Sequence, residues 1–146
     1  MYKHILIPTD GSELSVRAIK QGIGFAKEIQ AKVTGVYVVP HFYHLVDYYR
    51  DVDAKSIAKY EAAAKEQAEK YVAVIGNAAK AADVPCECVV MTGELPYELI
   101  IKTAEDKGCD LIFMASHGRR GIKGLVLGSE TLKVLTHCKV PVLVCR

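Results

Sequence analysis

Short apolar runs alternate with longer amphipathic segments along the chain. The runs are rich in Val, Ile and Leu and are bounded by turn-forming residues, which is typical of buried strands. They cover residues 4–8, 32–39, 86–91, 110–115 and 140–145. Because the runs are nearly continuous in apolar residues, both faces of each strand are expected to be covered, as in a parallel sheet flanked by helices.

Between these runs, apolar residues recur at the three-to-four-residue period of an amphipathic helix. Ser12 is placed to cap the first helix, and Pro96 suits the first turn of another. Helices are predicted from Ser12 to about Ile29 and over residues 54–82, 96–107 and 129–137. The alternation predicts one α/β domain over residues 1–146, with a doubly wound, five-stranded parallel sheet and helices on both faces.

The aromatic segment at 40–53 fits none of these elements. We interpret it as a loop that covers a site or contacts a partner, since loops of this length usually have a function or are mobile. Tyr43, Tyr48 and Tyr49 are candidates to stack on the planar ring of a ligand, although packing at a core or partner surface is the commoner role. His41 and His44 have metal-compatible spacing, but no Cys or carboxylate cluster accompanies them.

Composition and charge argue against some classes of function. The 146 residues carry 19 basic and 17 acidic side chains, for a formal net charge of +2. This balance does not favour nucleic-acid binding through a broad basic surface. The sequence has neither the long apolar run of a membrane-spanning helix nor the features of a signal peptide, so we expect a cytoplasmic protein without a membrane partner.

The five cysteines are expected to be free thiols, because their number is odd and the cytoplasm is reducing. Cys86 and Cys88 are two positions apart and therefore share one face of a strand. A metal-binding pair is one interpretation. Buried thiols that pack as small apolar groups are the commoner alternative.

Two predicted loops contain the candidate ligand-binding residues, since ligands of doubly wound sheets bind beyond the carboxyl ends of the strands. The first is Pro8-Thr9-Asp10-Gly11-Ser12, in which Asp10 suits Mg²⁺ or a ribose hydroxyl. A turn or helix-capping role for Asp10 is an equal alternative. Ser12 and Ser129 lack the nucleophile-elbow pattern and are interpreted as helix caps.

The second loop spans residues 116–129 and has the features of a phosphate cradle. Its glycines let backbone N–H groups approach an anion, and Gly128-Ser129 opens a helix whose N-terminus attracts negative charge. Arg119, Arg120 and Lys123 add local positive charge. A plain surface loop with solvated arginines is the alternative. Neither the P-loop nor the Rossmann glycine pattern occurs.

Three separated motifs make the chain similar to the universal stress protein family over its whole length. They are the opening Ile-Leu-Ile-Pro-Thr-Asp-Gly-Ser, the closing Val-Pro-Val-Leu-Val-Cys-Arg, and the glycine-rich loop. That loop resembles the signature of the family's ATP-binding branch, which is Gly, two residues, Gly, nine residues, Gly and Ser or Thr. Here Gly118, Gly128 and Ser129 match, and Ala115 replaces the first glycine.

The resemblance implies a fold of the adenine nucleotide alpha hydrolase-like kind, with strand order 3-2-1-4-5 and a homodimer that pairs residues 140–145. It implies a regulatory protein of the stress response that binds ATP, with or without Mg²⁺ at Asp10, or another adenylate. The implied nucleotide-binding residues are Pro8, Thr9, Asp10, Val38, Met114, Ala115, Ser116, His117, Gly118, Arg119, Arg120, Gly128, Ser129 and Glu130.

Two alternatives have the same fold: a nucleotide-free dimeric interaction protein and a weak ATPase. Hydrolysis needs a base and a positioned water, and no base is identifiable, so no catalytic residue is assigned. For His117, a structural hydrogen-bonding role is favoured over contact with phosphate. The departure from the signature at Ala115 bears most directly on ATP binding, because alanine adds a methyl group and disfavours positive φ.

Overall fold

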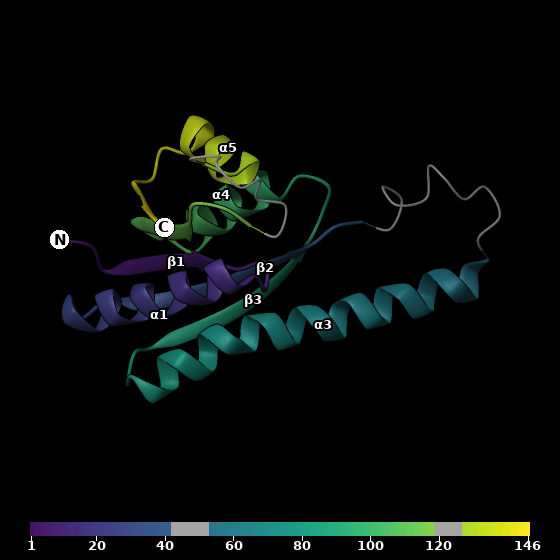
Figure 1. Cartoon of the computed structure of the whole chain (residues 1–146), viewed down its shortest axis with the longest axis horizontal. Coiled ribbons are helices and arrows are strands. Elements are labelled where there is room, and N and C mark those ends of the chain that lie inside the picture. The colour runs from purple at the N-terminus through teal and green to yellow at the C-terminus, as the bar shows by residue number, and fades with distance from the viewer. Residues whose placement is uncertain (42–52, 119–126) are drawn as a thin grey trace.

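A five-stranded parallel sheet forms the centre of the protein, in the computed structural model that describes residues 1–41, 53–118 and 127–146 (Figure 1). The strands are β1 (His4–Pro8), β2 (Lys32–Val39), β3 (Cys86–Thr92), β4 (Leu111–Ala115) and β5 (Val142–Cys145). Their order is β3-β2-β1-β4-β5, and the neighbours pair in parallel. The predicted fold and strand order are therefore confirmed.

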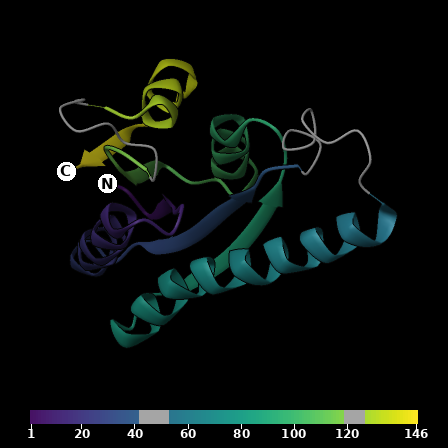
Figure 2. The same ribbon diagram turned by 45° about the vertical axis from the view of Figure 1, so that its right-hand side comes forward.

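Helices cover both faces of this sheet (Figures 1 and 2). They are α1 (Glu13–Glu28), α3 (Ala54–Ala81), α4 (Pro96–Asp106) and α5 (Ser129–His137). Helices α1 and α3 pack on one face, and α4 and α5 pack on the other. None of the helices in the described ranges is long and apolar enough to cross a membrane.

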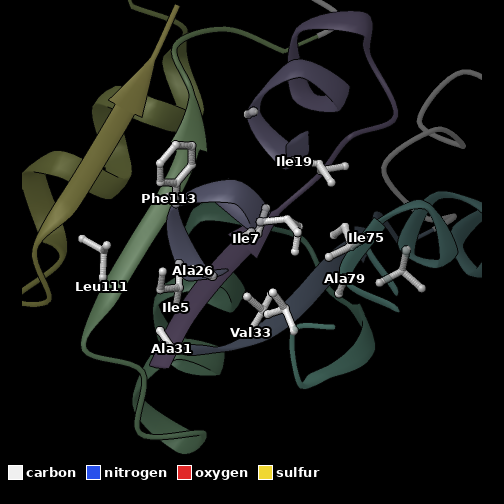
Figure 3. Close-up of a cluster of buried hydrophobic side chains, with 14 of the residues drawn as sticks. Ile5, Ile7, Ile19, Ala26, Ala31, Val33, Ile75, Ala79, Leu111 and Phe113 are labelled. Carbon is white, nitrogen blue, oxygen red and sulfur yellow. The ribbon is translucent and has the colours of Figure 1, made fainter. Parts of the chain in front are cut away.

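Strands β1 and β4 are buried along their whole length, which explains their continuous apolar sequence. Ile5, Ile7 and Phe113 enter the core under α1 and α3, as Figure 3 shows, whereas Leu6 and Ile112 enter the core under α4 and α5. This alternation follows from the two-residue repeat of a strand. Close packing on both faces gives the loops after β1 and β4 fixed starting points.

Helix α3 is much longer than the strand on which it packs. Its 28 residues span about 42 Å at 1.5 Å per residue, whereas the seven residues of β3 span about 23 Å. The buried residues of α3 all lie in its second half, from Ala68 to Ala79. Its first half extends beyond the sheet (Figure 1), and Ile57 and Tyr60 in that half are only half-buried.

One predicted cap is wrong. The residue that caps α5 is Gly128, and Ser129 is the first residue of the helix. Both residue types are common at this position, so the sequence pattern does not separate them. The predicted cap at Ser12 is confirmed, because its hydroxyl oxygen accepts a hydrogen bond from the Ser15 N–H. The predicted loop at 40–53 lies almost wholly outside the described residues.

Candidate functional site

The strand order reverses between β1 and β4. These two strands pair at Ile5↔Leu111 and Leu6↔Ile112. Farther along, β1 stays paired with β2 as far as Pro8, and β4 stays paired with β5 as far as Ala115. The loops that follow β1 and β4 thus leave the sheet on either side of the switch point, where ligands of doubly wound sheets bind.

The loop after β1 is held by its own side chains. The Asp10 Oδ1 atom accepts a hydrogen bond of 2.9 Å from the Ser12 N–H. The Thr9 hydroxyl oxygen accepts one of 3.1 Å from the Gly11 N–H and lies 3.0 Å from the Ser15 hydroxyl. These contacts fix the direction of the Asp10 side chain before any ligand binds.

Gly11 is the residue that allows this loop to lie against α3. Its φ of +76° belongs to the left-handed region, and a β-carbon on it would overlap the Tyr71 ring. Tyr71 in turn packs on Tyr37, with 5.3 Å between ring centroids. Sequence reasoning did not connect Tyr71 with this loop, because its helical spacing indicates burial without naming a partner.

The second loop meets the first at Asp10. A β-carbon placed on Gly118 would overlap the Asp10 Oδ2 atom, so no larger residue fits at position 118 without movement. The loops after β1 and β4 are therefore in contact, although 108 positions separate these two residues in the sequence. A carboxylate and a glycine backbone lie side by side at the switch point.

The N-terminus of α5 lies against the same loop. The Gly128 N–H donates a hydrogen bond of 2.7 Å to the Ser116 carbonyl oxygen. A β-carbon on Gly128 would lie 3.2 Å from the His117 Cα and 3.3 Å from the Ser116 oxygen. Since the φ of Gly128 is −72°, close approach of backbone, and not positive φ, accounts for this glycine.

A second contact ties the start of α5 to β4. The Thr131 hydroxyl donates a hydrogen bond of 3.0 Å to the Ala115 carbonyl oxygen. The first N–H groups of a helix lack acceptors within the helix and carry partial positive charge. These donors of α5 are thereby held next to Ser116 and His117, which suits an anionic ligand.

Ala115 lies within β4 and is only 8% exposed. Its methyl group belongs to the core under α1 and α3, beside residues such as Phe113. Among the described residues, only Gln30 and Asp83 combine a side chain with positive φ, so the backbone of Ala115 is not strained. The replacement of the first signature glycine therefore introduces no conformational penalty here.

The remaining implied residues lie at the same edge of the sheet but differ in exposure. Pro8, Thr9, Met114 and Ser116 are buried, whereas Val38 at the end of β2 is half-buried. Because the side chains of these four residues are buried, a ligand would meet mainly their backbone. Arg119 and Arg120 lie outside the described residues.

Glu130 and His117 have partners within the fold. The carboxylate of Glu130 accepts hydrogen bonds of 3.0 Å from the Tyr97 N–H and 2.9 Å from the Lys133 ammonium. Its side chain thus joins α5 to the start of α4, which leaves its backbone N–H as the group suited to phosphate. The Nδ1 atom of His117 lies 2.9 Å from the Ser116 hydroxyl oxygen, a contact that orients the ring within the loop.

The donor set for a metal ion is small. In the described parts of the chain, no group of three or more His, Cys, Asp or Glu side chains is arranged to hold a metal. Asp10 would therefore supply one protein ligand to Mg²⁺. That number suits this ion, which usually keeps several waters and takes its other ligands from phosphates.

Comparison with known proteins gives a consistent result. The model of the Universal stress protein family matches residues 1–146. The chain is 32% identical over 149 residues to Universal stress protein MJ0531 of Methanocaldococcus jannaschii, with 100% of this chain and 83% of the relative covered. The match thus includes both loops of the site.

Solved structures of other proteins have the same fold as this chain. Protein MJ0577, whose biochemical function was assigned from its structure, has a TM-score of 0.83 and 30% identity, with 99% of this chain and 95% of that chain covered. A universal stress protein in complex with cAMP has a TM-score of 0.70 and 22% identity, with 99% and 97% covered. At 22% identity, the second likeness concerns the fold alone.

Proposed function

The chain belongs to the universal stress protein family, and we propose that it binds an adenine nucleotide, ATP in particular, between the loops that follow β1 and β4. The observation that carries this proposal is the contact between Asp10 and Gly118 across the switch point, beside the N-terminus of α5. A carboxylate, a glycine backbone and helix N–H donors then surround one place at the edge of the sheet.

Each of these groups suits a different part of a nucleotide. The N–H groups of Ser129 and Glu130 would bind phosphate oxygens at the start of α5, with Gly128 allowing close approach. Asp10 is anionic and would repel bare phosphate, so its role would be to accept from a ribose hydroxyl or to hold Mg²⁺. Arg119 and Arg120 would neutralise phosphate charge from the segment between Gly118 and Gly128.

The likeness to a universal stress protein in complex with cAMP supports adenine-nucleotide binding at the level of the fold. ATP is the nucleotide that we assign here, because Gly118, Gly128 and Ser129 match the signature of the family's ATP-binding branch. In keeping with the family, we assign this binding a regulatory role in the stress response, in the cytoplasm.

We also propose that two copies of the chain pair through residues 140–145. Strand β5 is at one end of the strand order, and its outer edge has backbone groups suited to pairing with another strand. Leu143 on β5 is 36% exposed, and Leu132 on the neighbouring helix α5 is 55% exposed. Exposed leucines beside a sheet edge favour an interface between copies.

Calorimetric titration with ATP, with and without Mg²⁺, tests the nucleotide proposal. We expect saturable binding of one ATP per chain, with GTP weaker because the site would select adenine. The purified protein should first be exchanged through mild denaturation and refolding, so that any nucleotide that it carries does not mask binding. Absence of heat and of a thermal shift at millimolar ATP would overturn the proposal.

A further inference from the structure

Two cysteines share one face of β3, the face that α3 covers. Cys86 and Cys88 occupy alternate positions of β3, at the end of the strand order opposite β5. Cys86 packs against the core under α1 and α3. The Cys88 Sγ atom lies 3.4 Å from the Val72 carbonyl oxygen of α3. Both sulfurs therefore face the same helix.

A glycine in α3 makes room for this arrangement. A β-carbon on Gly76 would lie 3.3 Å from the Cys88 Sγ atom, which is tighter than an ordinary contact. Cys88 is nevertheless exposed at the edge of the sheet, and Cys86 is half-buried. The pair is thus accessible from solvent on one side and supported by packed residues on the other.

Both thiols donate hydrogen bonds to backbone oxygens. The Cys86 thiol donates to the Glu87 carbonyl oxygen at 3.5 Å, and the Cys88 thiol donates to the Val72 carbonyl oxygen at 3.4 Å. These are weak contacts for a thiol, so both sulfurs can exchange them for a metal ion. The thiolate is the form of cysteine that binds metal ions.

The strand spacing favours a bridging ion over a disulfide. Alternate residues of an extended strand lie roughly 6.6 Å apart and project in parallel. A disulfide requires β-carbons about 3.5–4.5 Å apart and an S–S bond of about 2.05 Å. An ion that binds both sulfurs in a line spans a longer sulfur–sulfur distance than a disulfide bond does, because each metal–sulfur bond is about as long as the 2.3 Å of Zn–S.

The number of protein ligands indicates which metal ion the two cysteines would bind. No third His, Cys, Asp or Glu side chain joins the pair within the described ranges, whereas structural zinc sites use four ligands. Soft thiolate ligands favour Cu(I) among the first-row metals. We propose that Cys86 and Cys88 form a two-sulfur site for a soft monovalent metal ion, with Cu(I) as the ion.

Binding involves no change of oxidation state. Cu(I) accepts one electron pair from each sulfur, and each thiol releases its proton to water. Uptake is thus coupled to proton release and weakens as the solution is acidified, because both ligands must be deprotonated.

Competition for Cu(I) under anaerobic, reducing conditions tests the site. The wild-type protein is titrated into Cu(I) held by the coloured chelator bicinchoninate, and we expect one ion per chain to be withdrawn. The double variant Cys86→Ser/Cys88→Ser and the single variant Cys88→Ser should lose this capacity. The matched control Cys138→Ser/Cys145→Ser removes two other half-buried thiols and should retain it.

The outcomes separate the proposed pair from general thiol affinity. Circular dichroism checks that each variant is folded, and X-ray absorption of the loaded wild-type protein should show two sulfur ligands. Failure of the wild-type protein to compete, undiminished competition by Cys86→Ser/Cys88→Ser, or loss in the Cys138→Ser/Cys145→Ser control would overturn the proposal. None of these results depends on nucleotide binding.

Discussion

The Asp10 carboxylate lies against Gly118 so closely that a β-carbon on the glycine would overlap Oδ2. This contact joins the loop after β1 to the loop after β4, at the point where the strand order reverses. Because the Ser12 N–H holds the other carboxylate oxygen, Asp10 cannot turn away without losing a hydrogen bond. The geometry of the candidate site thus depends on a residue with no side chain.

Replacement of Gly118 by Ala should weaken ATP binding while the fold persists. The added methyl group would push the two loops apart, and we expect the affinity to fall roughly tenfold or more, equivalent to about 1.4 kcal/mol. Calorimetric titration measures the change. Gly24→Ala is the control, since nothing lies within 4 Å of a β-carbon at that position in α1. Equal affinity of Gly118→Ala and wild type would contradict the proposed role of this contact.

Gly11→Ala should destabilise the protein more than Gly108→Ala does. Both glycines have positive φ, +76° and +65°, so alanine costs about 1–2 kcal/mol of backbone strain at each. Only Gly11 meets another side chain, the Tyr71 ring, whereas a β-carbon on Gly108 meets open space. Overpacking adds roughly 1–3 kcal/mol. Denaturant unfolding of both variants measures the difference, and equal losses would show that Tyr71 does not constrain the loop.

We expect the protein to lose stability as the pH falls below 6.5, the ordinary pKa of a histidine, because of His4. Burial and the nearby charge of Lys32 lower the pKa of His4, against the opposing effects of Glu87 and Asp110. Its Nε2–H donates to the Thr34 hydroxyl, which itself donates to Glu87. The unfolded chain therefore binds a proton at this residue first, and stability decreases from pH 6.5 down to the lower pKa of the folded protein.

Unfolding by denaturant at about pH 7.5 and about pH 5.5 measures this effect. The wild-type protein should lose stability between the two values, and His4→Gln should lose less, because glutamine keeps a hydrogen-bond donor without titrating. The lowered pKa of Glu87 acts in a separate window, below its ordinary value of 4.5. The same pH dependence in His4→Gln and wild type would exclude His4 as the cause.

A charge on β5 should separate the proposed dimer. Leu143→Glu places a carboxylate on the exposed edge strand, and we expect light scattering to report a single chain where the wild type forms two. Val74→Glu is the matched control, because Val74 is similarly exposed but lies on α3. A wild-type protein that is already monomeric, or a Leu143→Glu variant that stays dimeric, would contradict pairing through this strand.

The sequence pattern predicted the sheet well for a physical reason. Strands buried on both faces are nearly continuous apolar runs, so β1 and β4 are recognisable without tertiary information. The end of each run then locates a loop at the edge of the sheet, which is why Asp10 and Gly118 were both candidate site residues. That they touch is not encoded in either loop alone.

Other features depend on how elements sit on one another. Tyr71 has the spacing of a core residue, and only the placement of α3 brings its ring to Gly11. Glu130 looks like a helix-terminal residue suited to phosphate, yet its carboxylate accepts from the Tyr97 N–H at the start of α4. Local sequence patterns predict neither of these two contacts, because each contact joins segments that are distant along the chain.

Backbone amide spectra recorded during an ATP titration test the central proposal most directly. We expect the largest shifts at the N–H groups of Asp10, Gly11, Gly118, Ser129 and Glu130, with amides on α4 and at the far end of the sheet unchanged. Shifts that are absent at saturating ATP, or that cluster away from the loops after β1 and β4, would contradict nucleotide binding at this site.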